Sequence, residues 1–239
     1  MSQADAPRHP ARLRSFTRRG GRMLKQSHED AWERYAGTLV LDVPRPRGAD
    51  ASTGVDPAHR LDPSQVFGRS APLVVEIGSG SGDTLVHAAT QRPDWDFLAL
   101  EVWRPGIGHA MAKMDRPLPN VRFLEADAAL ALQTLLPPGG VHEVWTFFPD
   151  PWPKQRHHKR RLVSPDFAAT VAALVPTGGL WRLATDWAGY AHAMRQVLDA
   201  HPSWELASTG RAPLRPVTRF ERRGTEAGRE IVDLAYRRA

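Results

Sequence analysis

The sequence predicts an α/β protein built on a mostly parallel, doubly wound sheet. Two observations carry this prediction: short apolar runs alternate with helical patterns from about residue 72 onward, and a glycine-rich turn follows the first apolar run. Seven runs have the length and composition of strands, and the last two are expected to form an antiparallel pair. The expected strands cover 73–77, 97–100, 121–124, 144–148, 179–184, 204–207 and 231–236.

Helices are expected between these strands. A helical pattern begins after Gly82, and Pro105 suits the first turn of the next helix. Ser164 and Pro165 make a good N-cap and first helical residue. The expected helices run from 26 to 35, from about 83 to near 93, from 105, from 165 to 174 and from 187 to 200.

Composition divides the chain into three zones. Residues 1–41 are polar and basic and are expected to form an N-terminal extension. Residues 42–71 are rich in Pro, Gly and Asp and are expected to be a linker. Residues 72–239 are expected to form the α/β domain.

The charge and residue usage exclude several classes of protein. The 239 residues carry a net charge of +6 with a pI near 10.3, which favours a polyanionic partner. Cysteine is absent, which excludes disulfides, thiolate catalysis and Cys-ligated zinc. No apolar run approaches a membrane span, and the Arg-rich N-terminus lacks the apolar core of a secretory signal. We therefore expect a soluble, cytoplasmic protein.

The glycine turn after the first strand contains Gly78, Gly80 and Gly82. Glycines let a backbone turn tightly and approach a ligand, and a helix start offers unpaired N–H groups. The spacing is G-x-G-x-G, whereas the dinucleotide fingerprint is G-x-G-x-x-G and would need a third glycine where Asp83 stands. This disfavours a nicotinamide dehydrogenase, while a purely structural turn remains an alternative.

Acids stand at or just beyond the ends of four expected strands: Glu76, Glu101, Asp127 and Asp150. The carboxyl ends of strands in a doubly wound sheet line one crevice, where ligands bind. Any one of these acids could be a solvated loop residue, but four in register favour a site for a nucleoside with a cationic portion. S-adenosylmethionine, with its adenosine, ammonium and sulfonium groups, suits this rim. No metal is expected.

The fourth expected strand runs into the sequence Pro-Asp-Pro-Trp-Pro at 149–153. Two prolines restrain Asp150, whose carboxylate can accept the N1–H and N2–H donors of guanine. Trp152 offers a stacking face for a base, and Lys154 with the run 156–161 can neutralise phosphates. The alternative is a rigid surface turn with a solvated basic patch and Trp152 in the core.

These motifs closely resemble the bacterial tRNA (guanine-N7)-methyltransferases, a class I S-adenosylmethionine-dependent family with a Rossmann-like fold. The most specific match is the string F-P-D-P-W-P-K-x-R-H-x-K-R-R at 148–161. The basic segment from Arg14 to Arg22 resembles the N-terminal motif of the family. Thr218-Arg219-Phe220-Glu221 with Gly224 resembles its C-terminal T-K-F-E-x-x-G motif, with Arg219 in place of the usual lysine.

The resemblance implies a role for each motif. Glu76, Glu101, Asp127 and Asp150 would contact the cofactor or line its pocket, together with the glycine turn, and Asp150 would be the catalytic acid. The target nucleotide would be bound by Lys154, Asp186, Thr218, Arg219, Phe220 and Glu221. The tRNA would be contacted by Arg156, His157, His158, Lys159, Arg160 and Arg161. Asp186 could also simply cap the helix that follows it, and the motif at 218–221 could be an ordinary charged turn.

The expected reaction is transfer of the S-adenosylmethionine methyl group to N7 of a variable-loop guanine, position 46, of tRNA. N7 carries a lone pair and no proton, so Asp150 is expected to orient guanine and balance charge, and Glu221 is a second candidate for that charge. An amino-group methyltransferase acting on adenine or protein, and an RNA-binding protein without activity, remain alternatives. The protein is expected to be a monomer or homodimer.

Overall fold

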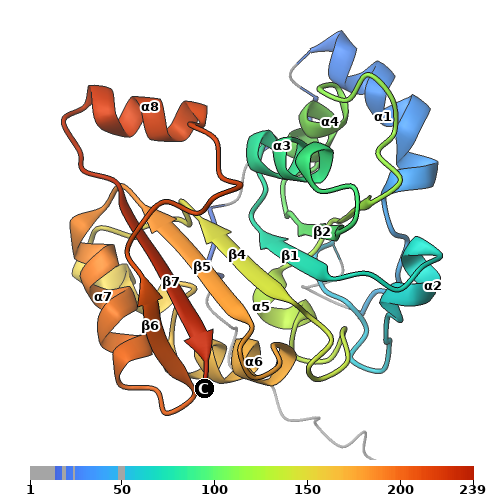
Figure 1. The fold of residues 1–239 in the computed structure, drawn as a ribbon. Helices are drawn as coiled ribbons and strands as arrows, with labels where there is room; N and C mark the ends of the chain where they lie inside the picture. The colour runs from blue at the N-terminus through green and yellow to red at the C-terminus, as the bar shows by residue number, and fades with distance from the viewer. Residues whose placement is uncertain (1–13, 18–19, 24, 48–51) are drawn as a thin grey trace, which may run out of the picture.

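The computed structural model describes residues 14–17, 20–23, 25–47 and 52–239. A seven-stranded sheet has the order β3-β2-β1-β4-β5-β7-β6 (Figure 1). Strands β1 to β5 pair in parallel, and β7 runs antiparallel to both β5 and β6. The strands are β1 (Leu73–Ile77), β2 (Asp96–Leu100), β3 (Val121–Leu124), β4 (Glu143–Phe147), β5 (Leu180–Thr185), β6 (Trp204–Ser208) and β7 (Val232–Arg238). The predicted fold class is confirmed.

Helices cover both faces of the sheet. Neighbouring strand residues point to opposite faces, so Val74 packs in a core with α1, α3 and α4, whereas Val75 packs in a second core with α5, α6 and α7. The helices are α1 (Gln26–Leu39), α2 (Pro63–Phe67), α3 (Asp83–Gln91), α4 (Arg104–Met111), α5 (Ala128–Ala131), the 3₁₀ helix η1 (Gln155–Arg160), α6 (Pro165–Leu174), α7 (Ala188–Asp199) and α8 (Arg219–Glu226).

The structure changes several of the expected boundaries and adds helices that the sequence patterns did not predict. Helix α1 continues beyond residue 35 because Leu39 is fully buried, and Val40 then forms a parallel bridge with Phe123. Strand β4 ends one residue early because Phe148 has a φ of +52°. Residues 219–226, which could have been a charged turn, form helix α8 with Thr218 as its N-cap.

The described part of the Pro- and Gly-rich segment packs against the sheet. Val43 and Val55 are buried in the core beside α5. Asp62 caps α2 by accepting a hydrogen bond from the Ser64 N–H at 2.9 Å. The Thr53 carbonyl accepts a 2.7 Å hydrogen bond from the N–H of Asp127, which places this segment beside the carboxyl edge of the sheet.

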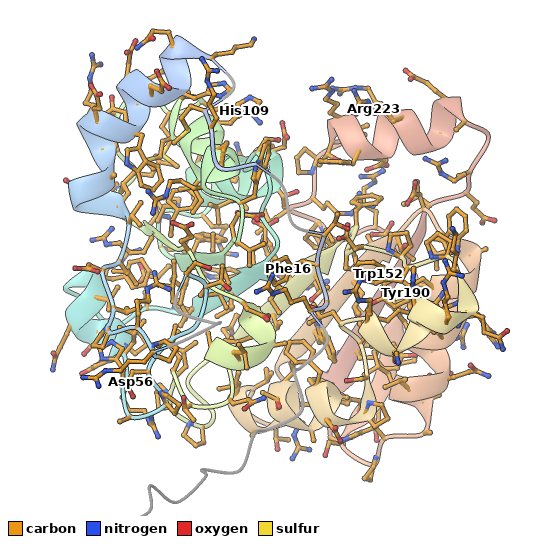
Figure 2. All side chains as sticks on the ribbon, turned by 180° about the vertical axis from the view of Figure 1, so that it is seen from behind. Phe16, Asp56, His109, Trp152, Tyr190 and Arg223 are labelled. Atoms are coloured by element: carbon orange, nitrogen blue, oxygen red, sulfur yellow. The ribbon has the colours of Figure 1, made fainter. Side chains whose placement is uncertain are left out.

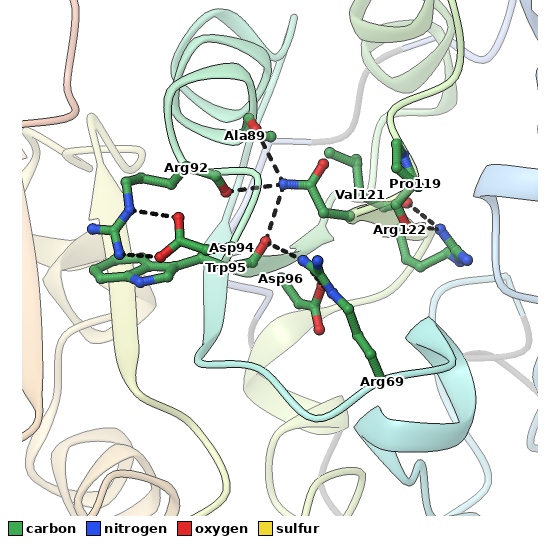
Figure 3. Close-up of polar contacts among 10 residues, drawn as sticks. Arg69, Ala89, Arg92, Asp94, Trp95, Asp96, Pro119, Val121 and Arg122 are labelled. Atoms are coloured by element: carbon green, nitrogen blue, oxygen red, sulfur yellow. Dashed lines mark hydrogen bonds and ion pairs between the residues drawn. The ribbon is translucent and has the colours of Figure 1, made fainter.

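Buried polar side chains at the amino edge of β2 and β3 have hydrogen-bond or ion-pair partners (Figure 3). The side-chain amide of Asn120 contacts the carbonyl oxygens of Ala89, Arg92 and Trp95 at 3.0–3.1 Å. Asp96 is buried and forms a 2.7 Å ion pair with Arg69. The polar side chains at this edge therefore have a structural role, in contrast to those at the opposite, carboxyl edge of the sheet.

Two absences hold for residues 14–17, 20–23, 25–47 and 52–239. None of the helices there combines the length and apolar character needed to cross a membrane. Nor do three or more His, Cys, Asp or Glu side chains gather there in a way that could hold a metal ion.

Candidate active site

A cavity of about 470 Å³ opens at the carboxyl ends of the central strands. Its lining includes all four of the acids expected at strand ends. The parallel arrangement of the strands thus brings Glu76 and Asp150, which are 74 positions apart in the sequence, into one site. The cavity is also lined by Gly78, Gly80, Asp186, Thr218 and Phe220. Of the other expected site residues, Gly82, Lys154, Arg219, Glu221 and the run 156–161 lie outside the lining.

The glycine turn shapes one wall of this cavity. Gly78 and Gly80 have φ of +75° and +54°, and a Cβ at either position would meet nothing within 4 Å, which leaves open space above the backbone. Gly82 has a different role: its φ is +72°, and a Cβ there would lie 2.4 Å from Cβ of Ala110. Gly82 therefore lets α3 pack against α4.

Glu76 is the most perturbed acid of the site. The residue is 4% exposed, and its Oε2 atom has no hydrogen-bond partner among the described residues. Burial, with the charges of Glu101 and Asp83, raises the pKa of Glu76 to about 8. A buried carboxyl group without a partner is costly, so this position favours a cationic, hydrogen-bonding ligand such as an ammonium group.

Glu101 and Asp127 are held in place by backbone N–H groups. Glu101 accepts hydrogen bonds from Gly80 at 2.7 Å and from Trp103 at 2.8 Å. Asp127 accepts from Ala129 at 3.0 Å and caps α5. Both side chains are therefore fixed acceptors at the wall of the cavity.

The described residues 14–17 and 20–23, here called the N-terminal arm, lie over the cavity. Ser15, Phe16 and Thr17 belong to its lining, and Phe16 lies over the centre of the molecule in Figure 2. The arm is anchored on both sides: the Trp103 indole N–H donates to the Gly20 carbonyl and the Trp152 indole N–H to the Ser15 carbonyl, both at 2.9 Å. Arg18 and Arg19, which were expected in the N-terminal motif, lie outside the described residues.

Asp150 and Trp152 play different parts in the proline-rich loop. Asp150 lines the cavity and accepts a 2.6 Å hydrogen bond from the Thr17 N–H. Trp152 has a φ of +44° and is not in the lining. The Arg160 guanidinium lies 4.5 Å from its ring centroid, and His157 packs edge-on at 5.8 Å. Trp152 thus packs between the arm and the basic segment and does not line the cavity.

The basic run 156–161 forms η1 and its C-cap. Lys154, Arg156, His158 and Lys159 are exposed, which suits contacts with phosphates. Arg161 differs from the other cations because it donates to the Pro151 carbonyl at 3.0 Å and lies 4.9 Å from the Tyr190 ring centroid. Arg161 therefore holds the loop to α7.

The acids near α8 are paired with arginines. Asp186 does not cap α7, whose N-cap is Trp187; it forms a 2.7 Å ion pair with Arg229. Glu221 is buried between Arg211 and Arg215, and Arg215 also binds Asp233 at 2.6 Å. Burial alone would raise the pKa of Glu221, but hydrogen bonds and charges from the two arginines lower it. The charge of Glu221 is thus already balanced.

Several lining residues had no sequence signal of their own. Phe16, Trp103 and Arg223 line the cavity although none stands at a strand end. Phe16 lies within the N-terminal motif, and Arg223 lies between Glu221 and Gly224 of the C-terminal motif. These two motifs could therefore have indicated both residues. Trp103 stands two residues after Glu101, in the connection between β2 and α4, and this position could have indicated that it lines the cavity.

The sheet order, the acids at the strand ends and the cavity together define a class I methyltransferase fold and site. The residues fit its cofactor, S-adenosylmethionine, because Glu76 offers an unpaired buried carboxyl oxygen and the glycine turn leaves open space. A solved 16S rRNA methyltransferase, KamB, shares this fold with a TM-score of 0.56 at 20% identity, over 74% of this chain and 92% of that one.

The family follows from sequence comparison. Residues 70–234 match the family model described as "Putative methyltransferase". A tRNA (guanine-N(7)-)-methyltransferase of Arthrobacter sp. (strain FB24) is 48% identical over 95% of this chain and 70% of its own. A relative of the same name from Alkalilimnicola ehrlichii is 44% identical over 99% of this chain and 97% of its own. The chain belongs to the tRNA (guanine-N7)-methyltransferase family.

Proposed function

We propose that this protein transfers the methyl group of S-adenosylmethionine to N7 of guanine 46 in the variable loop of tRNA. The observation that carries the proposal is the cavity itself, where the proline-restrained Asp150 meets the acid-lined pocket beside an exposed basic segment. The names of the relatives support tRNA guanine N7 as the target. A variable-loop guanine is accessible enough to leave its stack and enter such a pocket.

Three acids and the glycine turn would hold the cofactor. Glu76 would bind the ammonium group, Glu101 the ribose hydroxyls, and Asp127 the adenine end, while Gly78 and Gly80 allow close approach of the backbone. Bound S-adenosylmethionine supplies a methyl group on a positively charged sulfur, which leaves as a neutral thioether.

Asp150 would orient the guanine and balance the product charge. The N7 lone pair forms the new bond and no proton is lost from N7, so this chain need not supply a base. The purine becomes cationic, and the Asp150 carboxylate can stabilise that charge while accepting from the Watson–Crick edge. Glu221 is less suited to this role because Arg211 and Arg215 already neutralise it.

The other residues would bind the substrate. Asp186, Thr218 and Phe220 would contact the target nucleotide inside the cavity, with Lys154, Arg219 and Glu221 around it. The exposed cations of η1 would neutralise tRNA phosphates, with Arg161 holding that segment in position.

A tRNA with 7-deazaguanosine at position 46 tests the proposal, because this base has C–H in place of N7. We expect methyl transfer to unmodified transcript and none to the 7-deaza transcript, although both should bind with similar affinity. Equal transfer to both tRNAs would show that N7 of guanine 46 is not the acceptor.

A further inference from the structure

Helix α8 presents three different faces. Glu221 and Gly224, three residues apart, are buried. Phe220 and Arg223, also three apart, line the cavity, and Figure 2 shows Arg223 on α8. Arg222 is exposed, donates to the Val217 carbonyl at 3.3 Å and does not line the cavity.

Gly224 fixes α8 beside the cavity. A Cβ at this position would lie 3.0 Å from both Cβ and Oδ2 of Asp186, so a side chain here would push the helix outward. The Thr218 hydroxyl accepts from the Glu221 N–H at 3.3 Å and caps the helix at the cavity wall. The position of Arg223 over the cavity is therefore set by packing and capping.

Arg223 has an unpaired side chain among the described residues and lies at the wall of a cavity that several acids line. Five acids line this space besides Asp186: Glu76, Asp83, Glu101, Asp127 and Asp150. Among the described residues that line the cavity, two are arginines, and one of them, Arg229, is paired with Asp186 at 2.7 Å. Among the described residues the Arg223 side chain has no ion pair or hydrogen bond, and Arg223 is exposed at the cavity wall. A nucleotide entering this cavity brings a phosphate whose charge the acids would repel.

We propose that Arg223 binds the phosphate of the target nucleotide while Phe220 lies beside its base. A guanidinium group matches a phosphate with two parallel hydrogen bonds, and this pairing is stronger than one between neutral groups. Phe220 is 45% exposed and follows the same helix face, so ring and guanidinium are placed to contact one nucleotide. This proposal rests on the proposed function, because it assumes that the nucleotide enters this cavity.

Competition by free guanosine and guanosine 5′-monophosphate tests the phosphate site. Each compound is titrated against tRNA methylation by wild-type protein, Arg223→Ala, Arg223→Lys and Arg222→Ala. We expect the monophosphate to inhibit the wild type about tenfold more strongly than guanosine. Arg223→Ala should reduce this ratio to near one, Arg223→Lys should keep part of it, and Arg222→Ala should keep it whole.

Two results would overturn the proposal. One is that both compounds inhibit the wild type equally or not at all; the other is that Arg223→Ala keeps the wild-type ratio. Unchanged S-adenosylmethionine binding by Arg223→Ala, measured by calorimetry, shows that the variant is folded. Failure of the proposed function would appear separately, because wild-type protein would then form no 7-methylguanosine.

Discussion

The backbone N–H of Thr17 donates a 2.6 Å hydrogen bond to Oδ2 of Asp150, across 133 positions of sequence. The N-terminal arm thus contacts the same carboxylate that is proposed to accept from guanine. Ser15, Phe16 and Thr17 also line the cavity, so the arm forms part of the wall beside Asp150. Because the Thr17 N–H and the guanine donors would share one carboxylate, we expect the Thr17 contact to compete with guanine binding.

Replacing Thr17 by proline removes this N–H and tests the competition between arm and guanine. We expect Thr17→Pro to lower the KM for tRNA at least threefold, because a hydrogen bond to a charged group contributes about 1.5–3 kcal/mol. Thr17→Ala keeps the N–H and serves as the control, with a KM near that of the wild type. A raised KM in Thr17→Pro alone would mean that Thr17 positions Asp150 productively.

Cofactor affinity should depend on pH through Glu76. Burial first, and then the charges of Glu101 and Asp83, raise the pKa of Glu76 to about 8, so the carboxyl group is mostly protonated at pH 6. A cationic ammonium group favours the ionised form, so we expect S-adenosylmethionine to bind more tightly as pH rises from 6 toward 8. Calorimetry across this range should show the trend in wild-type protein and not in Glu76→Gln.

The same group should affect stability in the absence of cofactor. Unfolded glutamate titrates near pH 4.3, whereas folded Glu76 titrates near 8, so between these values the folded state holds the extra proton. Stability from this group is complete below about pH 4.3 and is lost as pH rises through 8. Glu76→Gln should flatten the fall in unfolding free energy between pH 5 and 8. An equally steep fall in the variant would assign the dependence to other groups.

Arg215 is expected to be essential for the stability of the fold around α8. Its side chain is fully buried and forms ion pairs with Glu221 and Asp233, so its loss leaves two buried carboxylates short of a partner. We expect Arg215→Met to lower the free energy of unfolding by about 3–5 kcal/mol in chemical denaturation. Arg211→Met, at a side chain that is 42% exposed, should cost about 1 kcal/mol or less.

The two kinds of glycine in the turn should respond differently to alanine. Gly82→Ala places a Cβ against Ala110 and should destabilise the fold by about 2 kcal/mol or more. Gly78→Ala meets open space and should cost only about 1–2 kcal/mol of backbone strain, but its methyl group enters the cofactor cavity. We expect the temperature of thermal unfolding to fall most in Gly82→Ala, and cofactor affinity to fall most in Gly78→Ala. Similar loss of cofactor affinity in both variants would contradict this division.

Much of the fold could be predicted because its signals are local. β1, β3 and α6 have the expected bounds, since turn or capping residues flank a short apolar run or a helical pattern. α8 has a capping residue, Thr218, but its buried face consists of Glu221 and Gly224, so no apolar periodicity marks it as a helix. Its stability comes from Arg211 and Arg215, which local patterns do not connect to it.

The site was predictable to the extent that strand ends define it. The four acids share one cavity because parallel strands end at one edge of the sheet. Side-chain direction could not be predicted: Trp152 has a φ of +44° and packs between Ser15 and Arg160, where a stacking face for a base was expected. The Thr17 contact with Asp150 likewise depends on tertiary packing.

The identity of the methylated atom tests the central claim most directly. Purified protein is incubated with S-adenosylmethionine carrying a labelled methyl group and with bulk tRNA, and the tRNA is then digested to nucleosides for chromatography and mass spectrometry. We predict that the label appears in 7-methylguanosine, and that Asp150→Asn gives the same product more slowly. Label on an exocyclic amino group, or no transfer to tRNA, would contradict the account.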